Sequence, residues 1–317
     1  MESKLFIGID LGGTNIAAGL VDAEGKLLDK VSIPTNADKG EKAVIEGIHK
    51  ACDLLYEKTG FDRSRLKAIG IGVPGMMDPN TGIVIFCPNL PIENVDLTSA
   101  LSEKWGVPVY INNDANCAAL GEAFAGGARD TTNAVCITLG TGVGGGIIID
   151  KKIYSGFNGA AGEVGHIVIM MDGRQCGCGR KGCWEAYASA TGLIKTTREY
   201  MQEHPETIMW ELAGGDLANV SGRTAFDAMR KGDEGGKFVV DLYIKHLAAG
   251  VIDMINIFQP EVLCIGGGIS NEGDYLLKPL QKLVDEARYT RGVPQTVIKR
   301  AELGNDAGIV GAAMLGA

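Results

Sequence analysis

The chain has 317 residues, of which 45% are hydrophobic and 22% are charged, and its formal net charge is −9. One hydrophobic core seldom fills so long a chain, so we expect two domains. The acidic balance argues against a nucleic-acid partner, which needs a basic face, and no apolar run reaches the roughly 18 residues that a membrane helix needs.

The beginning of the sequence predicts a three-stranded meander followed by a helix. Apolar runs over 5–9, 16–21 and 26–33 are separated by two turns that contain glycine. Short apolar runs bounded by turn residues are typical of strands joined by hairpins. Apolar residues then recur at helical spacing over Glu41–Thr59.

The next segment predicts two buried strands, over 67–73 and 108–111, with short helices over 97–105 and 115–124. The polar residues Asn112-Asn113-Asp114 follow the second strand directly. Ligands of open α/β sheets bind outside the carboxyl ends of strands, so this cluster is a candidate site.

The pattern of strand, glycine turn and strand recurs about 130 residues later, which indicates a weak internal duplication. A strand is expected over 134–139, a turn over Gly140–Gly146 and a strand over 147–149. The remaining predicted elements are helices over most of 187–258 with breaks at 214–219 and 231–236, a strand over 262–265 and a helix over 307–315. Two such halves predict two α/β lobes that face each other across a central cleft.

One imidazole and three thiols come within eighteen residues, at His166, Cys176, Cys178 and Cys183. Thiolates and imidazole suit tetrahedral Zn²⁺, and four protein ligands leave no open position for water, so the zinc would be structural. The alternatives are free thiols in a loop or a disulfide, and three clustered cysteines cannot all pair internally. The other cysteines lie singly in mostly apolar surroundings, and the sequence starts without a secretory signal, which together favour a reducing cytoplasm.

Glu163 and Glu185 lie close in sequence to the predicted metal ligands His166 and Cys183. Carboxylates beside an imidazole suit the binding of vicinal hydroxyl groups, and the metal would hold them in place. The alternative interpretation of both glutamates is that they are solvated surface residues.

Two glycine turns and one glycine run are candidates for nucleotide binding. The Asp10–Thr14 turn lacks the lysine of a P-loop, yet its glycine pair offers backbone N–H groups to phosphates. Asp10 would approach phosphates through Mg²⁺. Gly140–Gly146 is a second set of donors, and Gly266–Gly268 would lie along a nucleoside. The alternatives are ordinary tight turns and a flexible connection.

Asp114 is the candidate general base, because a carboxylate at a strand end can accept a hydroxyl proton during phosphoryl transfer. The alternative is that Asp114 is only the N-cap of the helix that follows.

Taken together, these residues resemble the ROK family of bacterial sugar kinases and related repressors, within the actin-like, ribonuclease-H-like ATPase superfamily. The resemblance runs along essentially the whole chain. Its markers are G-I-D-L-G-G-T-N at 8–15, G-I-G-V-P-G at 70–75, N-D-A-N-C-A-A-L-G-E at 113–122, the 140–146 turn and C-G-C-G-R-K-G-C-W-E at 176–185. The last of these markers is highly diagnostic, whereas many actin-like proteins share the glycine turns.

The resemblance implies an α/β fold of two ribonuclease-H-like lobes around a central cleft, with a zinc-binding insert. We expect a smaller lobe of residues 1–118 and 300–317 and a larger lobe of residues 119–299. Asp114 would be the base, and the sugar would be held by Gly75, Asn89, Asn113, Asp114, Glu163, His166 and Glu185. ATP and Mg²⁺ would be held by Gly8, Asp10, Gly12, Gly13, Thr14, Asn15, Gly140, Thr141, Gly142, Gly144, Gly145, Gly266, Gly267 and Gly268, and Zn²⁺ by His166, Cys176, Cys178 and Cys183.

The implied activity is the ATP-dependent phosphorylation of D-glucose to glucose 6-phosphate, the entry to glycolysis. The runs C-W-E-x-Y-A-S and Pro88-Asn89-Leu90 resemble the glucokinase members. The alternatives are a kinase for N-acetylmannosamine, mannose or fructose, or a sugar-sensing protein without catalysis. Members of the family are usually dimers or tetramers, so a homodimer or homotetramer without nucleic-acid or membrane partners is expected.

Overall fold

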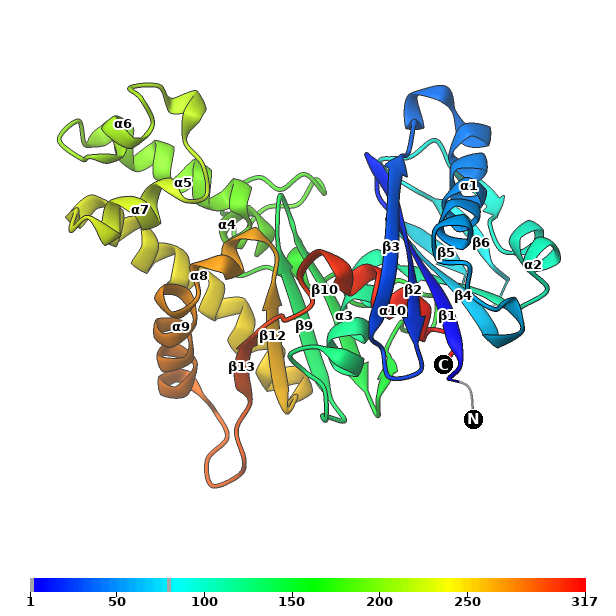
Figure 1. The fold of residues 1–317 in the computed structure, drawn as a ribbon. Helices are drawn as coiled ribbons and strands as arrows, with labels where there is room; N and C mark the ends of the chain where they lie inside the picture. The colour runs from blue at the N-terminus through cyan, green and yellow to red at the C-terminus, as the bar shows by residue number, and fades with distance from the viewer. Residues whose placement is uncertain (1–2, 79–80) are drawn as a thin grey trace. The chain divides into compact units, whose positions relative to one another are not determined.

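A computed structural model describes residues 3–78 and 81–317, with the elements labelled in Figure 1. The strands are β1 Leu5–Leu11, β2 Asn15–Asp22, β3 Leu27–Pro34, β4 Leu66–Val73, β5 Met76–Asp78, β6 Ile83–Phe86, β7 Glu93–Asp96, β8 Val109–Asn113, β9 Ala134–Leu139, β10 Val143–Ile149, β11 Lys152–Ile153, β12 Val262–Gly266 and β13 Val297–Arg300.

The α-helices are α1 Glu41–Thr59, α2 Ser99–Trp105, α3 Asp114–Ala125, α4 Glu185–Ala188, α5 Ala190–Glu203, α6 Met209–Leu212, α7 Thr224–Arg230, α8 Glu234–Phe258, α9 Asp274–Ala287 and α10 Ala307–Met314. Among the short 3₁₀ helices, η3 Val164–His166 carries one predicted zinc ligand. None of the helices in the described part of the chain combines the length and the apolar character that crossing a lipid bilayer requires.

Two five-stranded sheets dominate the fold, in the orders β3-β2-β1-β4-β8 and β11-β10-β9-β12-β13. When the strands of each sheet are numbered separately, the two orders are the same. β1, β2 and β3 form the expected antiparallel meander, and β4 runs parallel to β1 and to β8. The predicted α/β class with two repeated sheets is therefore confirmed.

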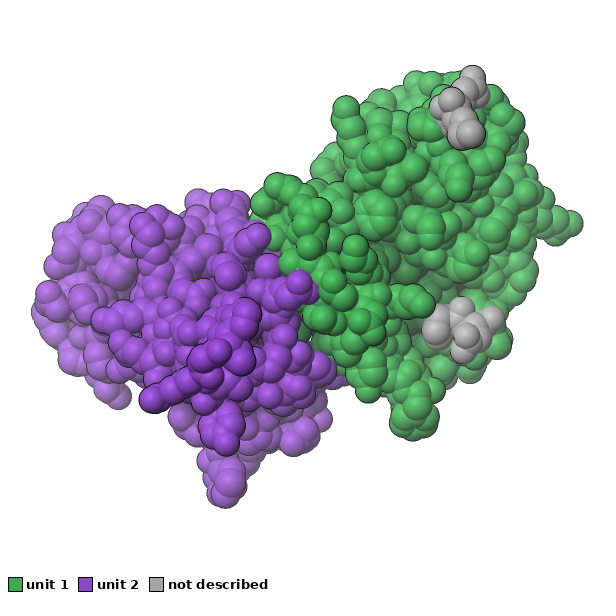
Figure 2. Space-filling model, turned by 90° about the horizontal axis from the view of Figure 1, so that it is seen from below, with its two compact units in different colours: residues 1–136, 146–162, 301–317 green, residues 137–145, 163–300 purple. Residues whose placement is uncertain are grey.

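The chain divides into two compact units, coloured separately in Figure 2. Unit 1 contains residues 1–136, 146–162 and 301–317, and unit 2 contains residues 137–145 and 163–300. The domain boundaries expected from the sequence stay a prediction, as does the cleft between two lobes.

Successive residues of strand β1 in unit 1 face opposite sides of the sheet, and each side is covered by a different layer. Leu5, Ile7 and Ile9 belong to a core that also contains Val44 and Ile48 of α1. The alternate residues Phe6, Gly8 and Asp10 face the other layer, where Phe6 packs with Val310 and Ala313 of α10. In Figure 1 the red helix α10 lies against the blue strands.

Two glycines allow α10 to approach this sheet at backbone distance. Gly8 and Gly70 are partners in the β1–β4 register. A Cβ at Gly8 would lie 1.8 Å from the carbonyl oxygen of Ile309, and one at Gly70 would lie 1.8 Å from that of Ala312. Any side chain there would force the helix away, so these glycines are needed for packing.

In unit 2 the segment after the cysteine cluster is fastened to the long helix α8. Trp184 is fully buried, and its indole N–H donates to the carbonyl of His246 at 2.9 Å. A Cβ at Gly250 would lie 2.2 Å from the Trp184 ring, so the ring packs directly on the helix backbone.

The structure corrects two sequence-based expectations and adds elements that were not expected. Strand β10 begins at Val143, so Gly144, Gly145 and Gly146 are strand residues and the turn is Gly140–Gly142. Helix α8 begins at Glu234, inside the predicted break at 231–236, because Asp233 caps it through the N–H of Gly236 at 2.8 Å. The small sheet of β5, β6 and β7, helix α9 and strand β13 were not predicted.

Candidate active site and metal centre

Asp10 lies at the carboxyl end of β1, on the side that α10 covers. A Cβ on Gly308 would lie 3.0 Å from the Asp10 carboxylate. Burial, and secondly the negative charge of Asp114, raise the pKa of Asp10 from 3.8 to about 6. Two interacting carboxylates at strand ends can hold a divalent cation or exchange a proton.

Asp114 is the first residue of α3 and follows directly on β8. The N-cap is Asn113, whose Oδ1 accepts hydrogen bonds from the N–H groups of Ala115 and Asn116 at 2.9 and 3.3 Å. The capping role considered for Asp114 therefore belongs to its neighbour. The Asp114 carboxylate lies in the first turn of α3, where its Oδ1 also accepts from the N–H of Ala115 at 2.8 Å.

The residues predicted to hold a substrate near Asp114 are linked to it within unit 1. Asn113 Nδ2 donates to the carbonyl of Gly75 at 3.4 Å. Burial and the charge of Asp114 raise the pKa of Cys87 to about 11, and Cys87 lies against Gly75. Asn89 is exposed and lies 4.0 Å from the position of a Cβ on Gly13. Unit 1 thus brings Gly75, Asn89 and Asn113 together with the two aspartates and the first glycine turn.

The first glycine turn, Gly12–Thr14, joins β1 to β2 and is held by a residue that sequence reasoning missed. Gly12 N–H donates to the carbonyl of Asn15 at 2.9 Å. The fully buried Thr35 donates its hydroxyl to the Gly12 carbonyl at 2.6 Å and its N–H to the Thr14 carbonyl at 2.9 Å. Gly13, Thr14 and Asn15 remain exposed, as a phosphate-binding turn requires.

The second glycine turn, Gly140–Gly142, lies in unit 2 beside the predicted nucleoside run. Gly267 has φ 81°, and a Cβ there would lie 2.4 Å from the carbonyl oxygen of Leu139, so only glycine fits. A Cβ at Gly140 or at Gly268 would meet no atom within 4 Å. Backbone that is open in this way can be approached closely by a ligand.

The four predicted zinc ligands come together in unit 2. His166, Cys176, Cys178 and Cys183 each place one ligand atom within 4.8 Å of the others. The His166 Nδ1–Cys176 Sγ distance is 3.7 Å, and the Cys178 Sγ–Cys183 Sγ distance is 3.6 Å. Zn–S bonds of about 2.3 Å in a tetrahedron separate two sulfurs by about 3.8 Å, so the cluster fits a zinc ion.

The two glutamates predicted beside the metal have different surroundings. Glu163 is exposed at the start of η3, three residues before His166. Glu185 is the first residue of α4 and is half-buried, with Oε1 3.8 Å from Cys176 Sγ and Oε2 accepting from the Val143 N–H at 3.0 Å. Surface solvation therefore does not describe Glu185.

Comparisons with known proteins agree on one family. The family model described as "ROK family" matches residues 6–317. The glucokinase of Thermotoga maritima is 38% identical over 316 residues, covering 99% of this chain and 98% of that protein. The glucokinase of Streptomyces coelicolor is 38% identical over 319 residues, covering 98% of this chain and 97% of that protein.

Among solved structures, a ROK family glucokinase from Streptomyces griseus, in complex with glucose and AMPPNP, is similar with a TM-score of 0.80 and 36% identity. That likeness covers 98% of this chain and 99% of the other. The match of the family model and the full-length relatives together show that the chain belongs to the ROK family.

Proposed function

We propose that this protein is a glucokinase, which transfers the terminal phosphoryl group of ATP to the 6-hydroxyl group of D-glucose. The supporting observation is the full-length likeness to glucokinases, combined with the interacting pair Asp10, near the end of β1, and Asp114, directly after β8 in the same sheet of unit 1. The relative of known structure binds glucose and AMPPNP, which are the acceptor and an analogue of the donor in this reaction.

In this proposal Asp114 is the general base. Its carboxylate accepts the proton of the 6-hydroxyl group while a bond forms between that oxygen and the terminal phosphorus of ATP. The bond from this phosphorus to the bridging oxygen breaks at the same time, and ADP leaves with the electron pair. Phosphoryl transfer needs little beyond such positioning and charge neutralisation.

The donor would be held by the backbone of the two glycine turns. Asp10 would hold Mg²⁺, which neutralises phosphate charge when it is bound. The raised pKa of Asp10 is the physical sign that a cation is favoured there, because burial and Asp114 both disfavour an uncompensated charge. Gly12, Gly13, Thr14 and Asn15 would bind phosphates at the first turn, and Gly140, Thr141, Gly142, Gly144 and Gly145 would do so at the second. Gly266, Gly267 and Gly268 would lie along the nucleoside.

The sugar would be held by the polar groups that the family resemblance names. These are Gly75, Asn89, Asn113 and Asp114, and also Glu163, His166 and Glu185. The zinc site fits a structural role, since His166, Cys176, Cys178 and Cys183 would fill all four positions of a tetrahedron.

The test is a coupled assay of ADP formation with Mg·ATP against glucose, mannose, fructose, N-acetylmannosamine and N-acetylglucosamine. A kcat/KM that is highest for glucose supports the proposal. A preference for another hexose replaces the substrate and keeps the reaction. No turnover with any of them overturns the kinase in favour of a sugar-sensing protein.

We propose further that the protein is a homodimer or homotetramer, on the basis of the family resemblance. Light scattering coupled to size-exclusion chromatography decides this directly, and a monomeric mass at working concentration removes the proposal.

A further inference from the structure

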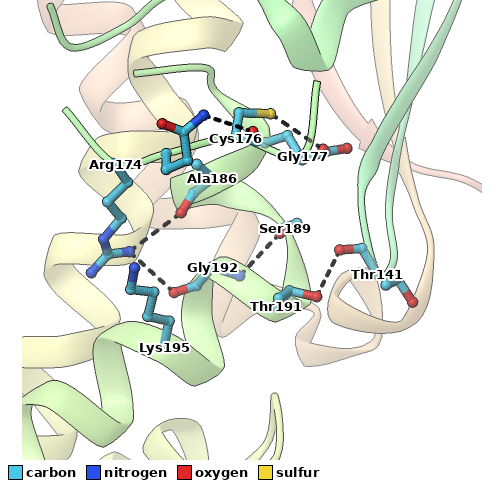
Figure 3. A pocket seen from close by; sticks show the side chains of 11 residues that line it. Thr141, Arg174, Cys176, Gly177, Ala186, Ser189, Thr191, Gly192 and Lys195 are labelled. Carbon is cyan, nitrogen blue, oxygen red and sulfur yellow. Dashed lines mark hydrogen bonds between the residues drawn. The ribbon is translucent and has the colours of Figure 1, made fainter. Parts of the chain in front are cut away.

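The second glycine turn is held by a segment that follows it by more than forty residues in the sequence. The N–H of Ala190 donates to the Gly140 carbonyl at 2.8 Å. The hydroxyl of Thr191 donates to the Thr141 carbonyl at 2.8 Å, and Glu185 Oε2 accepts from the Val143 N–H at 3.0 Å. Residues 185–191, the turn clamp, therefore contact the turn at Gly140 and Thr141, and β10 at its first residue, Val143. Figure 3 shows the Thr191 side chain directed at Thr141.

The turn clamp begins immediately after a zinc ligand. Cys183 belongs to the metal cluster, Trp184 is buried against Gly250 of α8, and Glu185 bonds to the turn. Three consecutive residues thus belong to the metal cluster, pack in the core and bond to the residue that directly follows the turn. A carboxylate so close to two fixed neighbours loses little conformational entropy when it binds the turn.

A second connection joins the cysteine-containing segment to the turn clamp. Arg174 donates to the carbonyls of Ala186 and Gly192 at 3.3 and 3.4 Å and to Thr196 Oγ1 at 3.0 Å. Its guanidinium also lies over the Tyr187 ring, 5.0 Å from the ring centroid. Arg174, Ala186 and Gly192 line a pocket of about 150 Å³ together with Cys176 and Thr141, as Figure 3 shows.

We propose that Glu185 and Thr191 are positioning residues for the phosphate donor, and that zinc occupancy sets the affinity for ATP through the turn clamp. The inference rests on the proposed function, because it assumes that the Gly140–Gly142 turn binds phosphates. Glu185 itself occupies the Val143 N–H. A phosphate would therefore be bound by groups of the Gly140–Gly142 turn, whose directions the clamp fixes. A turn held in its binding geometry binds more tightly than one that must be ordered on binding.

The experiment measures the binding of Mg·AMPPNP by isothermal titration calorimetry for the zinc-loaded full chain and three variants. Thr191→Val keeps the side-chain shape and removes the hydroxyl donor, so we expect Kd to rise about fivefold, as for the loss of one hydrogen bond. Thr191→Ser keeps the donor and restores the wild-type Kd. Thr197→Val is the matched control, because the Thr197 hydroxyl bonds to Leu193 within α5.

Steady-state kinetics separate positioning from a merely structural effect. Thr191→Val should raise KM for ATP, leave KM for the sugar unchanged, and unfold at the temperature of Thr197→Val. Equal rises in both KM values, or an unchanged Kd for Mg·AMPPNP, overturn the inference.

Removal of zinc tests the link to the metal. Chelated wild-type protein should bind Mg·AMPPNP more weakly than zinc-loaded Thr191→Val, and Thr191→Val should add no further loss once zinc is gone, because both changes release the same turn. Fully additive losses overturn the link. Zinc-loaded wild-type protein that binds no Mg·AMPPNP would overturn the proposed function instead, so the two failures are distinguishable.

Discussion

The two glycine turns have similar places in their sheets but are supported in different ways. Thr35, the residue after β3, holds the Gly12–Thr14 turn through a buried hydroxyl, so this support comes from the same meander. Thr191 holds the Gly140–Gly142 turn with the same kind of bond, but it belongs to a segment that the metal cluster anchors.

The same motif, a glycine turn between two strands, can therefore be supported by residues that are near it in the sequence or by residues that are far from it. The first turn should form whenever its meander forms. The second should depend on whether the cysteine cluster is ordered, and structural zinc orders such clusters as part of folding. The following predictions test this difference, and they run from the largest expected effect to the smallest.

The largest effect is expected from loss of the proposed general base, Asp114, which lies in the same unit as the first turn. Asp114→Asn should lower kcat about a thousandfold, which is in the range for the loss of a general base. The Kd values for glucose and Mg·AMPPNP should change little. Rapid-quench measurement of phosphoryl transfer checks this, and a kcat near that of wild type would remove Asp114 from its role.

Loss of the metal should affect the second turn and leave the first turn unchanged. Cys178→Ser removes one ligand, so the protein should retain no zinc and should unfold more easily by about 3 kcal/mol. Hydrogen exchange read by mass spectrometry should become faster at 140–145 and stay unchanged at 12–15. Equal acceleration at both turns would show that their supports do not differ as described. Cys264→Ser, which changes a buried cysteine outside the cluster, is the control.

A smaller effect concerns the charge beside the first turn. The pKa of Asp10 is raised from 3.8 to about 6, so the folded protein binds this proton more tightly than the unfolded chain does. The stability that Asp10 provides in its protonated form is present below about pH 4 and is lost as pH rises through about 6. Asp10→Asn should therefore stabilise the protein by about 2 kcal/mol at pH 8 and have little effect below pH 4. Urea unfolding at both values measures this, and destabilisation at pH 8 would contradict it.

The smallest effect is expected at the support of the first turn. Thr35→Val should destabilise the protein by about 1 kcal/mol, because the carbonyl of Gly12 loses its hydroxyl partner. Thr35→Ser should recover most of this. Zinc removal should not change the size of the loss, whereas a loss that depends on zinc would mean that the first turn also relies on the cluster.

Much of the fold could be predicted because local signals agree with the tertiary structure. The helical spacing of apolar residues in Glu41–Thr59 predicts the bounds of α1. In β1, every second residue faces the core that also contains α1. The small β5–β7 sheet was missed because its strands are only three or four residues long, with several exposed apolar side chains. The run of glycines predicts a turn over Gly144–Gly146, although these residues lie in β10. The sequence does not show that Ala115 and Ala119 of α3 pack so closely on Gly146 that no side chain fits there.

The metal cluster could be predicted from the spacing of its ligands, since C-x-C-x4-C beside a histidine gives all four donors. The roles of Thr35 and Thr191 could not. Each is a single hydroxyl that bonds to a carbonyl 23 or 50 residues away, and such contacts exist only once the chain has folded. Capping by Asn113 rather than Asp114 likewise depends on the backbone angles at one residue.

The backbone contact of α10 with Gly8 and Gly70 has a consequence for synthesis. In translation α10 follows β1 by about 300 residues, at rates of roughly 5–20 residues per second. The face of β1 and β4 that α10 covers therefore stays uncovered until residues 307–314 have left the ribosome. Phe6 and Ala68 lie on that face. The first strand to be made thus gains its last layer only at the end, and a nascent chain that stalls after β13 should be a ready target for chaperones.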